Sequence, residues 1–187
     1  MAVLPIIIAP DPRLKRKAAA VARVDAAVAR LMDDMLETMH AANGIGLAAP
    51  QVDVLARVIV VEIPPPKEVP PNHPDEKPKV FQMANPEIVW AADETAPRNE
   101  GCLSLPEHYA EVRRPVKIRV RYLDRQNEIR EIEAEGLLAV CIQHEMDHLD
   151  GVLFVDHVSA LKRGIILRKL AKTKRVNEPV AEPGMAG

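Results

Sequence analysis

The distribution of apolar residues along the chain predicts three helices. After Asp25, apolar side chains recur at intervals of three and four residues, which places them on one face of a helix. They are Val28, Leu31, Met32, Met35, Leu36 and Met39. Asp25 is suited to cap this helix, and Asn43-Gly44 to end it. A second helix is expected from Gly136 to the stop at Gly151, and a third from about Ser159 to Arg175.

Strands are predicted where β-branched residues cluster or alternate with polar ones. Residues 57–61 are a β-branched run, and in 116–122 apolar residues alternate with Lys117, Arg119 and Arg121. A turn is expected at 124–128, followed by a return strand from Ile129. Strands that lie beside separate helices predict an α+β fold.

The chain is expected to form one catalytic domain over residues 1–175. Its 187 residues are 48% hydrophobic and 28% charged, which is ordinary for a globular protein. The segment 63–79 contains seven prolines and is interpreted as a surface loop or insertion. The tail 176–187 is expected to be disordered.

The global properties exclude several classes of partner. A formal net charge of −2 gives no overall attraction to DNA or to a membrane surface. Two cysteines are too few for a disulfide scaffold, and no segment approaches the roughly 18 apolar residues of a membrane span. Pro5 and Pro10 interrupt the apolar N-terminal run, which argues against a signal peptide. A cytoplasmic protein is expected.

The sharpest chemical signal is the run His144-Glu145-Met146-Asp147-His148. Residues four apart on a helix share a face, so both imidazoles can reach one cation. Glu145 lies about 100° around the helix and can reach a metal-bound water without being a ligand. The alternative is a solvated helix face with two histidines. The apolar surroundings of the motif, including Val140 and Cys141, favour a buried site instead.

A catalytic metal needs a third protein ligand, and Cys102 is the candidate. Gly101 precedes it in the run Glu100-Gly101-Cys102-Leu103-Ser104 and permits a close backbone approach. A nearby cation would hold the thiol as thiolate. The alternative for a single cysteine is a small buried hydrophobe. Cys141 keeps that second interpretation, as a wall of a pocket.

The run Gly44-Ile45-Gly46-Leu47-Ala48-Ala49-Pro50-Gln51 directly follows the first predicted helix. Its glycines let the backbone lie close to a bound ligand, where it can pair with peptide groups. Gln51 adds an uncharged amide donor. Taken alone, this run would be only a helix end and a loop.

Taken together in chain order, the segments 44–51, 100–104 and 143–151 resemble the signature of peptide deformylases. The likeness covers the chain from Met1 to about Arg175, including Asp11-Pro12-Arg13-Leu14. The resemblance implies an α+β fold in which short mixed or antiparallel sheets surround a central metal-binding helix, with a further helix at the C-terminus. It also implies native Fe²⁺, with Zn²⁺, Ni²⁺ or Co²⁺ able to replace it.

The family's roles transfer to the matching positions. The metal ligands would be Cys102, His144 and His148. Glu145 would be the general acid and base, and Gln51 with the backbone N–H of Leu103 would hold the oxyanion. The residues that contact the substrate backbone or the methionine side chain would be Gly44, Ile45, Gly46, Leu137, Val140 and Cys141.

The implied reaction removes the formyl group from the N-terminal formyl-methionine of nascent polypeptides and releases formate. Two alternatives remain open at this point: a metallopeptidase that cleaves internal peptide bonds, and a non-catalytic structural metal-binding domain. The chain departs from the family in its longer proline-rich segment. It also departs at Tyr109, where many bacterial members carry an arginine that helps bind the peptide backbone. Preference beyond the first substrate residue is therefore left open.

The last predicted helix is strongly basic. No acidic residue lies between His157 and Asn177, and the cationic residues there are Lys162, Arg163, Arg168, Lys169, Lys172, Lys174 and Arg175. An apolar face is expected from Leu161, Ile165, Leu167 and Leu170. One interpretation is a solvated helix docked on the core. The other, which the resemblance supplies, is salt-dependent contact with ribosomal RNA.

Overall fold

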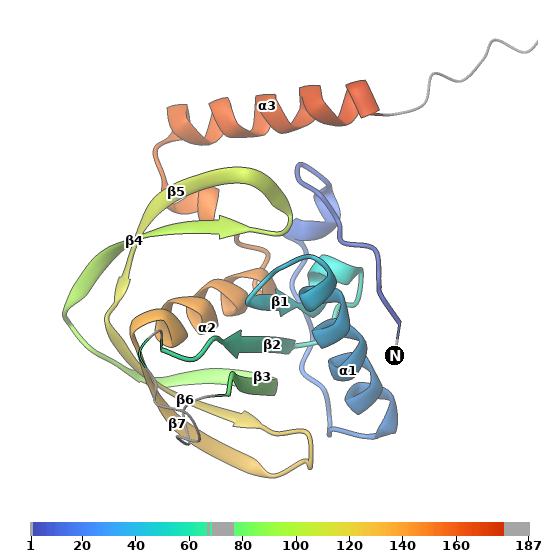
Figure 1. Cartoon of the computed structure of the whole chain (residues 1–187), viewed down its shortest axis with the longest axis vertical. Helices are drawn as coiled ribbons and strands as arrows, with labels where there is room; N and C mark the ends of the chain where they lie inside the picture. The colour runs from blue at the N-terminus through green and yellow to red at the C-terminus, as the bar shows by residue number, and fades with distance from the viewer. Residues whose placement is uncertain (1, 67, 69–76, 178–187) are drawn as a thin grey trace, which may run out of the picture.

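The structure of the chain is a computed structural model that describes residues 2–66, 68 and 77–177. Five strands form an antiparallel sheet in the order β1-β2-β3-β6-β7. Their bounds are Gly46–Ala48 (β1), Val58–Ile63 (β2), Lys79–Ala91 (β3), Lys117–Leu123 (β6) and Ile129–Glu135 (β7). A second antiparallel sheet is the hairpin of β4 (Thr95–Cys102) and β5 (Leu105–Pro115) (Figure 1).

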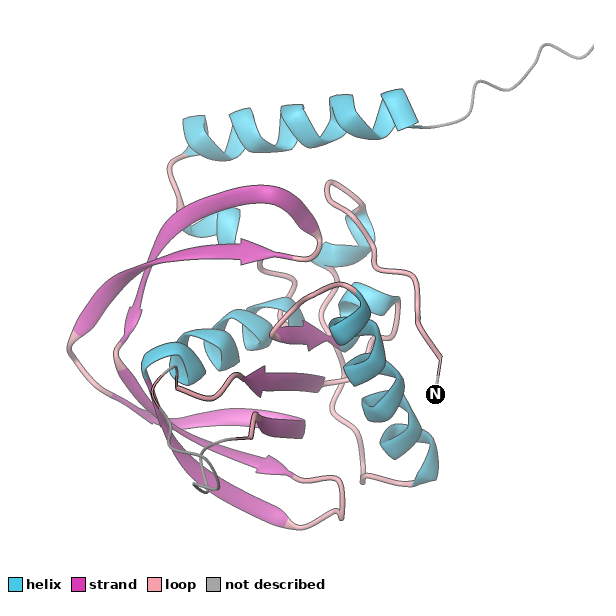
Figure 2. Ribbon diagram, viewed as in Figure 1, coloured by secondary structure: helices cyan, strands magenta, loops and turns pink. Residues whose placement is uncertain are grey.

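Three α-helices are arranged around these sheets: α1 (Ala26–Ala41), α2 (Gly136–Leu149) and α3 (Ala160–Asn177). Short 3₁₀ turns are η1 (Pro12–Lys15), η2 (Ala49–Val52) and η4 (Phe154–His157). Helix α2 runs through the centre, between the five-stranded sheet and the hairpin, while α3 lies outside the hairpin (Figure 2). The central helix can therefore receive side chains from both sheets.

The position of α2 is fixed at both of its ends. Gly136 adopts a left-handed backbone, φ +58°, where the chain passes from β7 into the helix. After the helix, Gly151 has φ +73°, and a Cβ there would lie only 2.7 Å from the carbonyl carbon of Lys15. The N–H of Ala18 donates to the carbonyl of Leu149 at 2.8 Å. A side chain at position 151 would push the end of α2 away from the N-terminal segment.

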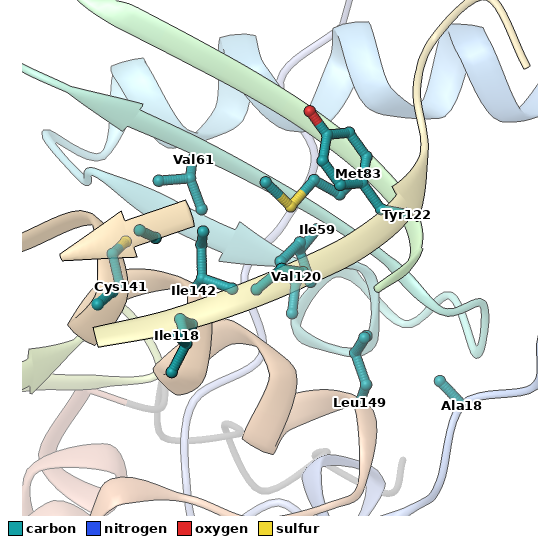
Figure 3. Packing of buried hydrophobic residues seen from close by; sticks show 13 residues of the cluster. Ala18, Ile59, Val61, Met83, Ile118, Val120, Tyr122, Cys141, Ile142 and Leu149 are labelled. Carbon is teal, nitrogen blue, oxygen red and sulfur yellow. The ribbon is translucent and has the colours of Figure 1, made fainter. Parts of the chain in front are cut away.

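The largest packing contact of α2 is with the five-stranded sheet. Ile142 and Leu149 are fully buried there, with Cys141 5% exposed. They meet the inward-facing residues of the sheet, which include Ile59, Val61, Met83, Ile118, Val120 and Tyr122 (Figure 3). Two further clusters lie under α1 and between the hairpin, η4 and α3. Because α2 is anchored on its apolar side, its polar residues keep fixed positions on the other side.

The predicted α+β class, with antiparallel sheets and a C-terminal helix, is confirmed. Asp25 caps α1 and accepts hydrogen bonds from Ala27 N and Val28 N, each at 3.0 Å. In β6 the alternation is as predicted: Ile118 and Val120 are buried, and Arg119 and Arg121 are exposed. The strand-rich segment 79–115 was not predicted, because its residues do not alternate cleanly.

The end of the C-terminal helix differs from the prediction, and the proline-rich segment can be compared with it only in part. Helix α3 extends to Asn177, two residues into the predicted tail, and residues 178–187 lie outside the described residues. Most of the proline-rich segment, residues 67 and 69–76, also lies outside them. The prediction of the apolar face of α3 was partly wrong. Ile166 and Leu170 are buried, whereas Leu161 is 72% exposed and Ile165 is 41% exposed. The single-domain assignment stays a prediction.

None of the helices in the described residues has the length and apolar character needed to cross a membrane.

Candidate metal centre

Two imidazoles and a thiol converge beside the central helix. The donor atoms of Cys102, His144 and His148 all lie within 4.8 Å of one another. Cys102 Sγ is 3.2 Å from His148 Nε2, although the two residues are 46 positions apart in the chain. The histidines lie one turn apart on α2, and Cys102 ends strand β4. The sulfur and the two nitrogens are a donor set typical of divalent transition metals.

Glu100 holds the ring of His144. His144 Nδ1 donates to Glu100 Oε2 at 2.8 Å, so the Nε2 atom is left to face Cys102. Burial would raise the pKa of Glu100, but its hydrogen bonds with His144 and Arg114 lower it to about 2. A carboxylate on the far nitrogen of a metal-binding histidine fixes its tautomer and orientation. The surroundings of the three donors therefore fit a bound cation.

The two histidines differ in their proton affinity. Burial lowers the pKa of His144, but hydrogen bonds to Cys102 and Glu100 raise it well above its usual value. The pKa of His148 is well below its usual value because of burial and the adjacent His144. His148 Nδ1 has no hydrogen-bond partner among the described residues. Only His144 is therefore connected through its second nitrogen to other polar groups of the described chain.

Glu145 follows His144 on α2, beside the three possible metal ligands, and is 4% exposed. Its Oε2 atom has no hydrogen-bond partner within the described part of the chain. Burial raises the pKa of this carboxyl to about 7, against the lowering effect of His144. A carboxyl with a pKa near neutrality can both accept and donate a proton at physiological pH.

Gln51 is held in one orientation by its neighbours. Its Oε1 accepts the backbone N–H of Ala48 at 2.8 Å, and its Nε2 donates to Ser104 Oγ at 3.1 Å. Nε2 also lies 3.5 Å from Cys102 Sγ. Because an N–H group needs an acceptor, the oxygen must face Ala48 and the amide hydrogens must face the sulfur. The N–H group of the Gln51 amide therefore points toward the three proposed metal ligands.

Gly46 allows strand β1 to pass directly over α2. A Cβ at this position would lie 2.8 Å from Cys141 Sγ and closer still to Glu145 Oε1. The contact accounts for the glycine, because any side chain would displace the Glu145 carboxyl.

These groups open into one cavity of about 700 Å³. Every residue predicted for the site lines it, apart from His148. The predicted lining residues are Gly44, Ile45, Gly46, Gln51, Cys102, Leu103, Leu137, Val140, Cys141, His144 and Glu145. The structure therefore brings together three segments that are far apart in the sequence.

The cavity is larger than the predicted set of residues. Pro106, Glu107 and Tyr109 extend it along β5, and Ile6 and Ile8 of the N-terminal segment also line it. Tyr109 packs over Gly101 and is 63% exposed. The predicted departure at Tyr109 therefore lies on the rim of the cavity. The apolar pair Ile6 and Ile8 was visible in the sequence, but nothing there indicated which cavity it would line.

Arg114 is a further residue that the sequence did not single out. It is 6% exposed and forms two hydrogen bonds with Glu100, at 2.6 and 2.9 Å. Position 114 lies 14 residues after Glu100, and only the pairing of β4 with β5 brings them together. The one available signal was Glu100 itself, an acidic residue two positions before the cysteine.

Comparison with known proteins gives consistent results. A sequence model of the polypeptide deformylase family matches residues 3–164. A peptide deformylase of Methylocella silvestris is 52% identical over 185 residues, covering 98% of this chain and 92% of the relative. The crystal structure of peptide deformylase from Ehrlichia chaffeensis aligns with a TM-score of 0.86 at 39% identity, over 94% of this chain and 98% of that one.

A second structure of the Ehrlichia chaffeensis protein, in complex with actinonin, has a TM-score of 0.85 at 40% identity and covers 94% of this chain and 99% of that one. These relatives do not support a peptidase of internal bonds or a structural metal domain. The chain is a member of the polypeptide deformylase family, the hydrolases that remove the formyl group from nascent polypeptides.

Proposed function

We propose that the chain hydrolyses the N-formyl group of N-terminal formyl-methionine on nascent polypeptides and releases formate. The observation that carries this proposal is the placement of five groups in one site. They are the donors Cys102, His144 and His148, the Glu145 carboxyl and the Gln51 amide. The formyl carbonyl would lie among these groups.

Cys102, His144 and His148 would hold one divalent cation, Fe²⁺ in the native protein and Zn²⁺, Ni²⁺ or Co²⁺ as substitutes. When bound, the cation would lower the pKa of a coordinated water from 15.7 toward about 7 and polarise a carbonyl oxygen. Glu100 supports this arrangement by holding His144 Nδ1.

Glu145 would transfer the protons of the reaction. Its Oε2 has no partner in the described part of the chain, and its pKa is raised to about 7. It would take a proton from the attacking water and then give it to the departing amine nitrogen. The close contact with Gly46 fixes where this carboxyl lies.

Gln51 Nε2 and the backbone N–H of Leu103 would donate to the oxygen of the tetrahedral intermediate. Gln51 needs little reorganisation for this role, because Ala48 and Ser104 already hold its amide. Loss of one such donor typically costs about 10²–10³ in kcat.

The methionine side chain would occupy the apolar part of the cavity formed by Ile45, Leu137, Val140 and Cys141. Gly44 and Gly46 would let the backbone at the start of β1 pair with the peptide. An apolar pocket discriminates one methylene by only about 1–3 kcal/mol, so preference for methionine should be graded. Later residues of the peptide would pass Tyr109 at the rim.

The test is formate release from a formyl-methionyl peptide by protein purified without oxygen, with metal analysis of the same sample. We expect formate in a 1:1 ratio with new free amino groups, no cleavage of casein, and inhibition by actinonin. Casein cleavage without formate release would contradict the proposal.

We further propose that the protein acts in the cytoplasm, where α3 contacts ribosomal RNA. The cationic residues Lys162, Arg163, Arg168, Lys169 and Lys172 are exposed on this helix. Co-sedimentation with ribosomes should weaken as salt rises. A variant with Lys162, Arg168 and Lys172 changed to Gln should co-sediment less than the parent at low salt while retaining its deformylase activity. Equal co-sedimentation would reject the contact.

A further inference from the structure

A continuous chain of polar contacts leads from the surface to the metal centre. It begins at His157, whose Nε2 donates to Asp147 Oδ2 at 2.7 Å. The same carboxylate oxygen is 2.9 Å from Arg114 Nη1. Arg114 then contacts Glu100, and Glu100 accepts from His144. Four contacts thus connect a side chain that is 37% exposed with a proposed metal ligand.

Arg114 is the rigid part of this chain. Its Nε and Nη2 donate to the two oxygens of Glu100, at 2.6 and 2.9 Å, as a planar fork. This geometry fixes the plane of the carboxylate, which in turn sets the direction of the bond to His144. The remaining guanidinium nitrogen, Nη1, contacts Asp147, and no other described contact of this nitrogen is known. The plane of the fork therefore depends on the position of Asp147.

The position of Asp147 depends in turn on His157. Asp147 lies on α2 and His157 at the end of η4, so their hydrogen bond also ties these two elements together. Without the donor from η4, the half-buried Asp147 side chain would keep only its contact with Arg114 and would be less firmly oriented. Glu100 and Asp147 carry two negative charges against the one positive charge of Arg114. These three side chains together carry one net negative charge, which favours a nearby cation.

We propose that Asp147 and His157 are positioning residues for the metal centre, and that they act through Arg114 and Glu100 on the ring of His144. This inference rests on the proposed function, since it assumes that His144 binds the catalytic metal. It assigns a role in metal binding to a residue on η4 that neither lines the cavity nor belongs to any of the motifs.

The test compares metal retention in two variants of residue 157. His157→Phe removes the donor to Asp147, whereas His157→Gln retains an N–H donor at a similar reach. His40→Phe is the matched control, because His40 also ends a helix and pairs with a carboxylate, Glu62, at 2.8 Å. His40 belongs to neither the contact chain nor the cavity lining. Each Co²⁺-loaded protein is titrated with a chelator, and the thiolate-to-cobalt absorption band is recorded.

Loss of a direct outer partner of a metal ligand typically costs 10–100-fold in metal affinity, so we expect about 3- to 10-fold for the more distant His157→Phe. His157→Gln should bind Co²⁺ nearly as well as the parent, and His40→Phe equally well. The absorption band should shift in His157→Phe, and kcat should fall while KM stays unchanged.

Equal Co²⁺ affinity in His157→Phe and the parent would overturn the inference, as would equal losses in His157→Phe and His40→Phe. Neither result affects the proposed function, provided the parent protein binds Co²⁺ and releases formate. A parent protein that fails to retain Co²⁺ through Cys102 would instead contradict the proposed function itself.

Discussion

At the scale of single residues, most polar groups of the site are fixed by hydrogen bonds to their neighbours. One carboxyl group keeps an oxygen that can exchange a proton. Gln51 is fixed by Ala48 and Ser104, and His144 by Glu100. Glu145 is buried, yet one of its oxygens has no partner among the described residues. A buried polar atom without a partner is costly, and a catalytic role is one reason for a protein to retain such an atom.

Glu145→Gln should keep the metal but lose most turnover. The amide is similar in size and cannot accept and release the proton. We expect kcat to fall by about 10²–10⁴, the range typical of general acid–base catalysis. Steady-state formate release and metal analysis of the same preparation measure both quantities. Unchanged kcat would remove Glu145 from the mechanism.

Gly46→Ala should reduce kcat, because the new Cβ would overlap Cys141 Sγ and the Glu145 carboxyl. The matched control is Gly164→Ala on α3, where a Cβ meets no atom within 4 Å. Alanine is favoured over glycine by about 1 kcal/mol inside a helix, so the control should be neutral or more stable. Formate assays and thermal melting of both variants measure the difference between them. Full activity in both variants would contradict the prediction.

The polar residues that the structure brings together at the candidate site were largely predictable, because the chemistry limits the residue types, while their roles stay predictions. Two imidazoles four residues apart, a glycine before a cysteine, and an amide after a glycine-rich run each have a physical reason. Arg114 could not be predicted, because its role arises only when β4 pairs with β5. The direction of the Gln51 amide is likewise a property of the folded state.

At the scale of elements, the hairpin β4–β5 was the hardest part to predict. β4 has the sequence Thr-Ala-Pro-Arg-Asn-Glu-Gly-Cys, and only Glu100 among its residues is buried. Strand formation there depends on the partner strand rather than on local preference. Helices α1 and α2 were predictable because their apolar faces are continuous and their ends carry an aspartate cap or a glycine.

Ile142→Ala should test how strongly α2 is anchored to the sheet. Ile142 is fully buried in the cluster between them, and truncation of such a residue costs about 2–5 kcal/mol. Ile129→Ala is the matched control, since Ile129 is 72% exposed at the start of β7, and it should change the free energy of unfolding by about 0.5 kcal/mol or less. Chemical denaturation of both variants gives the comparison. Similar losses would mean that the packing of α2 contributes little.

At the scale of the whole molecule, the donor group joins two separately packed parts. Cys102 belongs to the hairpin and packs against its cluster, whereas the histidines belong to α2. Composition and charge gave no sign of a membrane span or of overall attraction to DNA, and they carried no information about this junction. Its existence follows from the topology alone.

Metal removal should therefore loosen the hairpin more than the five-stranded sheet. A ligand that binds only the folded state stabilises it by RT ln(1 + [L]/Kd), about 4.1 kcal/mol at a thousandfold excess over Kd. Hydrogen exchange with and without Zn²⁺ should show the largest change in β4 and β5. Cys102→Ala should make the two profiles alike, and a uniform change across both sheets would contradict this expectation.

The exposure of the cavity lining differs from one part to another, which affects how a polypeptide could bind in it. Beside the metal donors the lining is buried, with His144 7% and Glu145 4% exposed, while Tyr109 in the same lining is 63% exposed. A peptide whose first residue reaches the buried part would leave its later residues at the exposed part. Lengthening the peptide beyond Tyr109 should therefore change formate release little.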